Sequence, residues 1–442
     1  MTQHKMYGSK SRKTLRLSCA TLAFLCSMSA TAAWSQESLL IEPSLPPDFD
    51  RGRNISVTQR ERPDYDPIGI RAGSFNVFPQ LSASLGYSDN IYYSTKNTAK
   101  DGFIQLSPSV LVNSDWSRHS LRLRAGSQIQ RYFSETRRNQ TPWDFAALGT
   151  LEMGESLRLT PEVQIEKDFE TPFSGETTAD NAVLSSYVRK YAGLRGEYSG
   201  GQTKLSLAVN NTNFQFDDIV RQSGAVFDQG NRDRNIFRVS GQAQYAFTPS
   251  VAAYAQLGYA HTVYDEDLQL GVPNRDSDGY TATAGFNFDL SGLLRGTIGL
   301  GYSRRNFRAD LFRDIDGFSA EGKLEYFPSD LTTITLAARR VIEDSNLGST
   351  SGFFDNRASL RVDHELRRNV IVNLLGEVAR QDYVDSAAAV DVYRISGGGV
   401  LMSSNWLSFN LNVAYTGRNS NNPLVGQDFN EFRGQIGIVL KR

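Results

Sequence analysis

Hydrophobic and polar residues alternate along most of the chain. In one segment, Leu121, Leu123 and Ala125 share a face whose opposite side carries Arg122 and Arg124. About 18 segments show this alternation, and each is about 10 residues long, as expected of a tilted strand that crosses a membrane. Such a period is typical of β-strands with one apolar and one wet face. A soluble β-sandwich would give the same period, so the alternation alone does not fix the architecture.

The connections between these segments alternate between short and long. Short turns are expected at Asp115–Arg118, Gly154–Ser156, Ser199–Gly201, Pro249–Ser250, Ser291–Gly292, Pro328–Asp330, Arg367–Asn369 and Ser404–Asn405. Long polar loops are expected at Ser88–Asp101, Thr171–Ser186, Asp217–Asn235, Asp265–Gly279, Arg305–Gly317, Glu343–Asp355 and Gly417–Asn430. An outer-membrane barrel sorts its connections in this way, with short periplasmic turns and long extracellular loops, whereas a sandwich has no reason to. We therefore predict an all-β fold over residues 74–442: a closed antiparallel transmembrane β-barrel of about 18 strands, within a range of about 16–18.

Aromatic residues gather at the ends of the predicted strands, where the interfacial girdles of a membrane barrel would lie. They are Tyr92, Tyr93, Trp116, Tyr132, Phe133, Trp143, Phe169, Tyr264, Tyr326 and Trp406. The final predicted strand, from Phe432 to Leu440, is followed by Lys441-Arg442 instead of the terminal aromatic residue that many such barrels use for assembly. The partners expected of this architecture are outer-membrane lipid and the barrel-assembly machinery.

The first 33 residues have the order of a secretory signal peptide. A basic opening precedes an apolar run from Leu17 to Met28, and small residues follow up to Ala33. The apolar run has about 12 residues, too few for a spanning helix, which needs roughly 20. Both cysteines of the chain, Cys19 and Cys26, lie within this segment, so we expect no disulfide in the exported protein.

Residues 34–73 are rich in proline and precede the predicted barrel. Pro43, Pro46, Pro47, Pro63 and Pro67 favour an extended periplasmic lead-in. Three roles stay open for it: a simple tether, a partial plug that folds into the lumen, or a docking segment for a periplasmic partner.

Three short motifs follow one another at the entry to the predicted barrel. Residues 62–75 read RPDYDPIGIRAGSF, residues 87–92 read YSDNIY, and residues 113–116 read NSDW. They resemble the entry, first-loop and first-hairpin motifs of the outer-membrane β-barrel protein family of Gram-negative bacteria, also called putative β-barrel porin type 2. The matching positions are Arg62, Pro63, Tyr65, Pro67, Gly69, Arg71, Gly73, Asp89, Asn90, Asp115 and Trp116. The resemblance implies an outer-membrane barrel, sometimes associated with surface-polysaccharide systems, and it implies no catalytic residue.

Charge and residue chemistry narrow the possible functions. The chain has 47 Lys and Arg against 48 Asp and Glu, so it lacks the basic surplus of a nucleic-acid-binding protein, and we expect no such partner. There is no nucleophile elbow, and His119, His261 and His364 lie in three different predicted hairpins with no second ligand at metal-binding spacing. We predict no catalytic residue, no metal and no cofactor, and hence a protein that is not an enzyme.

Charged residues on the polar faces of the predicted strands are the candidate functional positions. They are Arg122, Arg124, Arg158, Glu162, Glu166, Arg238, Arg295, Glu321, Glu325, Arg339, Arg357, Arg361, Asp363 and Glu377. Facing ladders of opposite sign would filter charged solutes in a pore, whereas local pairing would only solvate the wall. We predict a porin-like channel for passive diffusion of small hydrophilic solutes. The alternatives are an outer-membrane component of a surface- or exopolysaccharide export system, with periplasmic export proteins as partners, and a non-conducting structural barrel.

Overall fold

The computed structural model describes residues 55–171, 173, 184–220, 224–290, 292–345, 350–423 and 425–442. The predicted signal peptide and residues 34–54 of the predicted lead-in lie outside the described residues. No helix in the described part is long and apolar enough to cross a membrane. Two single turns of 3-10 helix, η2 (Thr136–Arg138) and η3 (Gly230–Arg232), are the helical elements that it contains.

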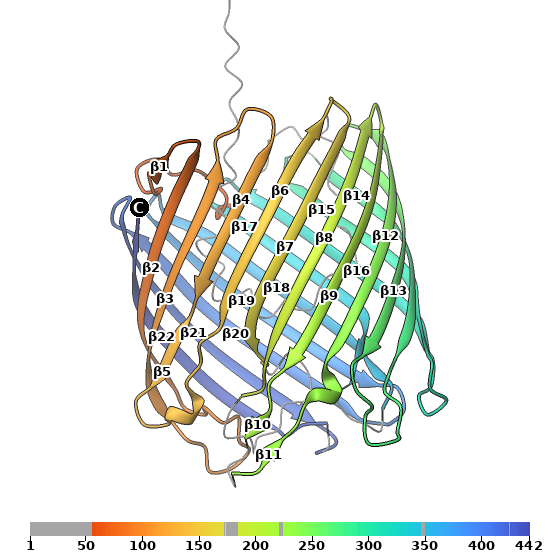
Figure 1. Ribbon diagram of the computed structural model, residues 1–442. Coiled ribbons are helices and arrows are strands. Elements are labelled where there is room, and N and C mark those ends of the chain that lie inside the picture. Colours follow the sequence, from red (N-terminus) through yellow and green to blue (C-terminus); the bar gives the residue numbers. More distant parts are fainter. Residues whose placement is uncertain are drawn as a thin grey trace, which may run out of the picture.

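The chain forms a closed antiparallel β-barrel of 18 strands (Figure 1). Each strand pairs with the next along the chain, and the first pairs with the last to close the barrel. The third strand consists of two pieces, β4 and β5, that both pair with β3. The strands are β2 (Phe75–Ser88), β3 (Asp101–Ser114), β4 (Ser120–Ser127), β5 (Ile129–Tyr132), β6 (Trp143–Met153), β7 (Leu157–Phe169), β8 (Ser186–Gly200), β9 (Thr203–Phe216), β12 (Arg234–Thr248), β13 (Val251–Tyr264), β14 (Ser277–Leu290), β15 (Leu294–Phe307), β16 (Ile315–Ser329), β17 (Thr332–Asp344), β18 (Gly352–Arg367), β19 (Val370–Tyr383), β20 (Ala389–Met402), β21 (Leu407–Ser420) and β22 (Phe429–Lys441). The predicted fold class is confirmed.

Short and long connections lie at opposite ends of the barrel. The short-turn end is at the top of Figure 1, where the C-terminus also lies, and the long-loop end is at the bottom. Gly154 and Gly201, with φ of 74° and 57°, form the tight turns between β6 and β7 and between β8 and β9. This left-handed backbone region favours glycine because it has no Cβ. The hairpin of β10 (Ile219–Val220) and β11 (Val226–Phe227) belongs to a long loop at the other end.

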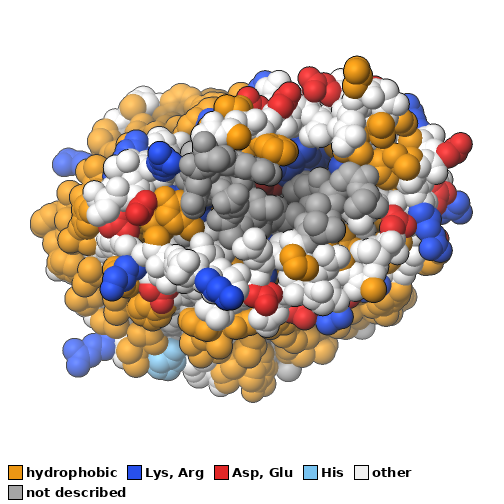
Figure 2. All heavy atoms as spheres, turned by 90° about the horizontal axis from the view of Figure 1, so that it is seen from below, with side chains coloured by type: hydrophobic (Ala, Val, Ile, Leu, Met, Phe, Trp, Pro, Cys, Tyr) orange, Lys and Arg blue, Asp and Glu red, His pale blue; other side chains and the backbone are white. Residues whose placement is uncertain are grey.

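The outer surface of the barrel is apolar and the inner face is polar, the reverse of a soluble protein. Large hydrophobic side chains such as Leu257 and Ile436 are 69% and 62% exposed on the outside. Figure 2 views the long-loop end and shows hydrophobic side chains around the sides of the barrel, with charged ones along its rim. On the inside, Gln244 and Gln381 are almost fully buried. This arrangement satisfies the backbone hydrogen bonds within a closed sheet and leaves apolar side chains for lipid.

The predicted aromatic girdle is only partly correct. Phe133 and Trp406 are exposed on the outside, as a girdle requires. Tyr132 and Tyr264 are instead buried on the inner face, opposite Phe103 and Arg234 in the strand register. Position at a strand end does not decide which face a side chain takes; the parity of the residue within its strand does.

The described part of the predicted lead-in lies inside the short-turn end. Val57 is fully buried and packs against Ile371 and Met402. Its backbone N–H donates to Thr333 Oγ1 at 2.9 Å, one residue after β17 begins. The chain then leaves the lumen through β1 (Ile70–Ala72), which pairs only with β2.

Candidate functional site

The inner face carries every charged position that the alternation predicted for the lumen. The strand register places these side chains on the same face as buried polar residues such as Gln244 and Gln381. They are Arg122 and Arg124 on β4, Arg158, Glu162 and Glu166 on β7, Arg238 on β12, Arg295 on β15, Glu321 and Glu325 on β16, Arg339 on β17, Arg357, Arg361 and Asp363 on β18, and Glu377 on β19.

Several of these charges form ion pairs with a neighbour in the wall. Arg295 Nε lies 2.6 Å from Glu325 Oε2 on the next strand, and Arg124 Nε lies 3.3 Å from Asp144 Oδ2. Arg158 pairs in the same way with Glu152 at 2.8 Å. The charges therefore neutralise one another over short distances instead of forming two facing ladders of opposite sign.

The barrel interior has two contrasting regions, which adjoin where β15 pairs with β16; in Figure 1, β7–β9 and β12 of one region lie in front of β18–β20 of the other. We call the inner face of β16–β21 the filled wall and the inner face of β7–β9 and β12–β15 the hollow wall. In the filled wall, Asp355 is fully buried between two guanidinium groups. Its Oδ2 lies 2.9 Å from Arg339 Nη2 and 2.8 Å from Arg357 Nε. All three side chains are at least nine-tenths buried, so this group belongs to a packed interior and not to an open channel.

Phe173 covers the filled wall although it lies in the connection between β7 and β8, on the hollow side. Its side chain is 1% exposed and packs in an apolar cluster with Phe353 and Val392. Its carbonyl oxygen accepts a hydrogen bond from Arg357 Nη2 at 2.6 Å, and the Arg394 guanidinium lies 4.7 Å from its ring. A residue from one side of the barrel thus closes over the opposite side near the long-loop end.

Glu170 anchors the start of the connection between β7 and β8. Its carboxylate forms a buried ion pair with Arg232 of η3. Burial by itself would raise the pKa of Glu170, but the Arg232 guanidinium outweighs this effect and holds the pKa below its usual range.

The lead-in fills the other end of the filled wall. Arg62 is 3% exposed, and its Nη2 lies 2.7 Å from Glu365 Oε2. Arg60 Nη1 approaches the same carboxylate oxygen at 3.2 Å. The Arg62 backbone N–H donates to Asp66 Oδ2 at 2.7 Å. Burial raises the pKa of the Asp66 carboxyl, although this hydrogen bond and the nearby Lys441 ammonium act against the shift.

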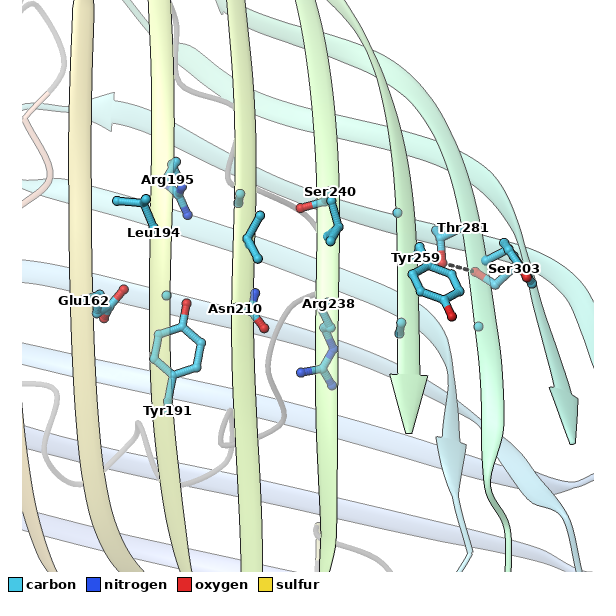
Figure 3. Close-up of a pocket in the computed structure, with 18 of the residues that line it drawn as sticks. Glu162, Tyr191, Leu194, Arg195, Asn210, Arg238, Ser240, Tyr259, Thr281 and Ser303 are labelled. Carbon is cyan, nitrogen blue, oxygen red and sulfur yellow. Dashed lines mark hydrogen bonds between the residues drawn. The ribbon is translucent and has the colours of Figure 1, made fainter. Parts of the chain in front are cut away.

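The hollow wall contains a cavity of about 510 Å³, shown in Figure 3. Strand register aligns its lining in two adjacent rows across the sheet. One row runs Thr160, Arg195, Ala208, Ser240, Gly258, Thr281 and Ser303, and the other runs Glu162, Gly193, Asn210, Arg238, Ala260, Gly279 and Arg305. The first row contains Ala208 and Gly258, and the second contains Gly193, Ala260 and Gly279. The cavity exists because these small residues leave the space that larger side chains fill elsewhere in the lumen.

The cations of the cavity differ in how they are neutralised. Arg189 Nε lies 2.7 Å from Glu166 Oε1, and Arg305 pairs with Asp344. Arg238 Nη1 lies 3.5 Å from the hydroxyl oxygen of Thr212. The Arg195 side chain has neither a hydrogen bond nor an ion pair within the described part of the chain, and its Nε is buried.

Of the cavity lining, the sequence singled out only Glu162 and Arg238; among the residues that it missed are Arg189, Tyr191 and Arg195 of β8. The signal was present, because they share one face of β8 with Gly193 and Glu197. Lys190 interrupts the opposite face, which otherwise carries Val188, Ala192 and Leu194. Because Lys190 puts a charge on the outer face, the alternation of apolar and polar residues along β8 was not recognised from the sequence.

Several family-motif residues fix the entry to the barrel. Gly69 has φ of 77°, and a Cβ there would lie 2.7 Å from the Phe78 ring. Arg71 forms an ion pair with Asp115 at 3.1 Å across the first hairpin, while the Trp116 ring centroid lies 5.7 Å from that of Phe75.

The remaining motif residues hold the lead-in and the first loop. Tyr65 packs on the Val57 cluster. Asp89 Oδ1 accepts the backbone N–H of Phe432 at 2.7 Å, and Asn90 Nδ2 donates to the carbonyl oxygens of Ser94 and Asn430. Of the other motif positions, Gly73 turns the β1–β2 hairpin with φ of 60°, Pro63 is exposed, Pro67 is half-buried, and Arg62 binds Glu365 as described.

The histidines do not gather into a site. His261 Nδ1 on β13 lies 2.7 Å from Asp278 Oδ1, and His364 Nδ1 on β18 lies 2.9 Å from Thr332 Oγ1. Among the described residues, no three His, Cys, Asp or Glu side chains are placed to hold a metal ion.

Comparisons with known proteins identify a sequence family and a set of barrels with similar folds. The model of the family described as "Putative beta-barrel porin 2" matches residues 62–442. The outer membrane protein OpdK of Pseudomonas aeruginosa has 13% identity and a TM-score of 0.44, over 83% of this chain and 99% of its own. OccAB4 of Acinetobacter baumannii has 10% identity and a TM-score of 0.45, over 83% of this chain and 98% of its own.

The siderophore receptor PirA of Pseudomonas aeruginosa has 8% identity and a TM-score of 0.42, over 86% of this chain and 81% of its own. No curated protein matches the chain.

Proposed function

The chain belongs to the family described as putative β-barrel porin 2, an outer-membrane barrel family, and on that premise we propose that it is a channel for passive diffusion of small hydrophilic solutes. The observation that carries this proposal is the cavity of about 510 Å³ in the hollow wall. Barrels of about 16–18 strands are wide enough to leave an aqueous lumen unless chain segments fill it. Here such segments cover the filled wall, and the cavity opposite, which is lined by charged, hydroxyl and apolar side chains, supports a water-filled path.

We assign the short-turn end to the periplasm and the long-loop end to the cell exterior. This orientation follows the general rule for bacterial outer-membrane barrels. It puts Arg62 and Glu365 at the periplasmic mouth and Phe173 toward the outer mouth. The lead-in then acts as a partial plug that narrows the path from the periplasmic side.

Reconstitution of the purified exported protein tests the channel directly. We expect discrete conductance steps in planar bilayers, and swelling of proteoliposomes at a rate that falls as the neutral sugar becomes larger. Heat-denatured protein and empty liposomes serve as controls. A protein that migrates as a folded barrel on unheated gels, yet gives neither conductance nor swelling, would be a structural barrel and not a channel.

A second candidate function is a conduit in a surface-polysaccharide export system. The docked lead-in favours it, because a periplasmic partner that binds residues near Arg62 would also control access to the lumen. Deletion of residues 34–69 should then remove a co-purifying periplasmic protein and lower the amount of polymer at the cell surface. If polymer and co-purifying proteins are unchanged, this candidate fails and the diffusion channel is unaffected.

A further inference from the structure

Three buried polar atoms in the lining of the hollow-wall cavity have no hydrogen-bond partner within the described residues. Nε of Arg238 is one, although Nη1 of the same guanidinium contacts Thr212. The other two are Nε of Arg195, which is a donor, and Oδ1 of Asn210, which is an acceptor. Figure 3 shows Arg195 and Asn210 on the neighbouring strands β8 and β9. Buried polar atoms in native proteins nearly always have partners, so two unmet atoms of opposite type in one cavity suggest a ligand that supplies both.

We propose that this cavity is a binding site for a small hydroxyl-rich carboxylate, of the sugar-acid class, with Arg195 binding the carboxylate and Asn210 accepting a hydrogen bond from a hydroxyl group. The proposal rests on the channel function above and names the class of solute that the channel favours.

Charge determines that the ligand is an anion. Arg189 and Arg305 already have carboxylate partners in Glu166 and Asp344. Arg195 has no such partner among the described residues, and the guanidinium group matches a carboxylate in both geometry and charge. The single acidic side chain in the lining, Glu162, lies on β7 at the diagonal position from Arg195. It accepts a hydrogen bond from Gln164 at 2.6 Å and forms no ion pair with Arg195.

Hydrogen bonding determines that the anion carries hydroxyl groups. A carboxylate can only accept hydrogen bonds, so it would leave Asn210 Oδ1 unmet. The register pairs Arg195 with Ala208, which puts Asn210 at the diagonal position of the next strand, about 7–8 Å away between backbones. The lining adds the hydroxyl groups of Thr160, Ser240, Thr281 and Ser303, of which the last two lie 3.4 Å apart. These groups can donate to or accept from a polyol chain.

The space suits a molecule of sugar size. Small-molecule sites in proteins usually have volumes of about 300–1,000 Å³, and the cavity of about 510 Å³ falls within that range. The small residues Gly193, Gly258 and Gly279 make the floor of the cavity, so a ligand can lie close to the backbone of the sheet.

Three small molecules test separately whether the site recognises the carboxylate and whether it recognises the hydroxyl groups. Gluconate carries a carboxylate and hydroxyl groups, glucitol carries only the hydroxyl groups, and acetate carries only the carboxylate. We expect calorimetric titration of the detergent-solubilised full protein to give gluconate binding at least roughly tenfold tighter than binding of either other probe, because each probe loses a charge-assisted or buried hydrogen bond. Equal affinity for gluconate and glucitol would overturn the proposal.

Substitutions test whether Arg195 binds the carboxylate and Asn210 binds a hydroxyl group of the ligand. Arg195→Ala should weaken gluconate binding by roughly tenfold and leave glucitol unchanged, and Arg195→Lys should restore part of the loss. Asn210→Ala should weaken both gluconate and glucitol and leave acetate unchanged. The matched control is Arg380→Ala, which removes an arginine that pairs with Asp382 on the exposed outer face. Each variant is first checked for folded migration on unheated gels, and a folded Arg195→Ala protein with unchanged gluconate affinity would refute the assignment.

Bilayer recordings separate this inference from the channel function itself. If the barrel conducts and gluconate neither binds nor blocks the current, the channel function is supported and the binding site is refuted. If gluconate binds through Arg195 and no current or swelling occurs, the binding site is supported and the diffusion function is refuted.

Discussion

The filled wall and the hollow wall contain the same kinds of residue but have different interiors. On the filled wall, Asp355 forms buried ion pairs with Arg339 and Arg357, and Glu365 forms one with Arg62 of the lead-in. On the hollow wall, the inner face contains glycine and alanine between its charged residues, and a cavity remains. Charge alone therefore does not make a solute site. The difference lies in which wall receives segments from distant parts of the chain.

This contrast has a physical cause. A buried ion pair costs desolvation energy for both charges, and it is stable only when neighbouring groups complete the hydrogen bonds. Phe173 contributes to this on the filled wall, because its carbonyl oxygen accepts a hydrogen bond from Arg357 Nη2, while Asp355 is fully buried and its Oδ1 has no hydrogen-bond partner among the described residues. Arg195 receives no such cover within the described residues, so its charge stays available to a solute.

The largest expected effect comes from removing the central acid of the filled wall. Asp355→Asn should lower the free energy of unfolding by about 3–5 kcal/mol, because two buried guanidinium groups lose their shared carboxylate. The temperature at which the barrel loses folded migration on gels measures this. Asp382→Asn is the matched control, since its partner Arg380 is exposed and such pairs contribute less than about 1 kcal/mol. Equal losses in both variants would mean that burial of the Asp355 ion pair in the filled wall adds nothing over an exposed pair on the outer face.

The second prediction concerns the lead-in. Glu365→Gln should weaken docking of the lead-in by about 2 kcal/mol, because the hydrogen bonds from Arg62 and Arg60 lose their ionised acceptor. The exported protein is expected to lack cysteine, so Val57→Cys provides a single labelling site. We expect the labelling rate at this position to rise roughly tenfold or more in the Glu365→Gln background and single-channel conductance to increase. An unchanged labelling rate would show that Glu365 does not hold the segment.

The third prediction concerns the floor of the cavity. A Cβ at Gly193 would lie 2.5 Å from the Tyr191 hydroxyl oxygen, so Gly193→Ala should push this ring toward the cavity. The expected cost is about 1–3 kcal/mol, with a lower conductance. Gly258→Ala is the control, because the nearest atom to its Cβ lies at 3.8 Å and the methyl group fits. Equal conductance in both variants would mean that the solute path avoids this cavity.

The smallest expected effect is the dependence of lead-in docking on pH. Burial raises the pKa of Asp66 in the docked state, so the docked lead-in favours the protonated carboxyl. The stability that this protonation adds to docking is complete below the pKa that Asp66 has in the free lead-in. It is lost as pH rises through the higher pKa of the docked state. Docking should therefore tighten in acid and conductance should fall, by less than about threefold because Asp66 is only partly buried. Asp66→Asn should flatten this profile. The stability of the Glu170–Arg232 contact depends on pH in the opposite direction. The pKa of Glu170 is lowered, so the stability that this contact contributes is lost as pH falls.

A conductance that instead rises in acid would show that the contact at Glu170, near the long-loop end, controls the path and that the lead-in does not. Glu170→Gln would then remove the dependence while Asp66→Asn would leave it intact.

The sequence by itself determined the strands, the closure of the barrel and the face of the charged residues that it singled out. Alternation along one strand is a local property, since neighbouring side chains must point to opposite faces, so Arg238 and Glu377 could be placed from their own segments. The same rule would have placed Tyr132 and Tyr264 inside, had parity been followed instead of position at a strand end.

Only the tertiary structure decided which side of the lumen is filled. The contact between Arg62 and Glu365 joins residues 303 positions apart, and that between Phe173 and Arg357 joins residues 184 apart. Strand tilt and stagger set these contacts, and no local pattern encodes where a lead-in or a loop will settle inside a barrel. The cavity beside Arg195 is a consequence of that placement, because a space remains where small side chains face the lumen and none of the described segments covers them.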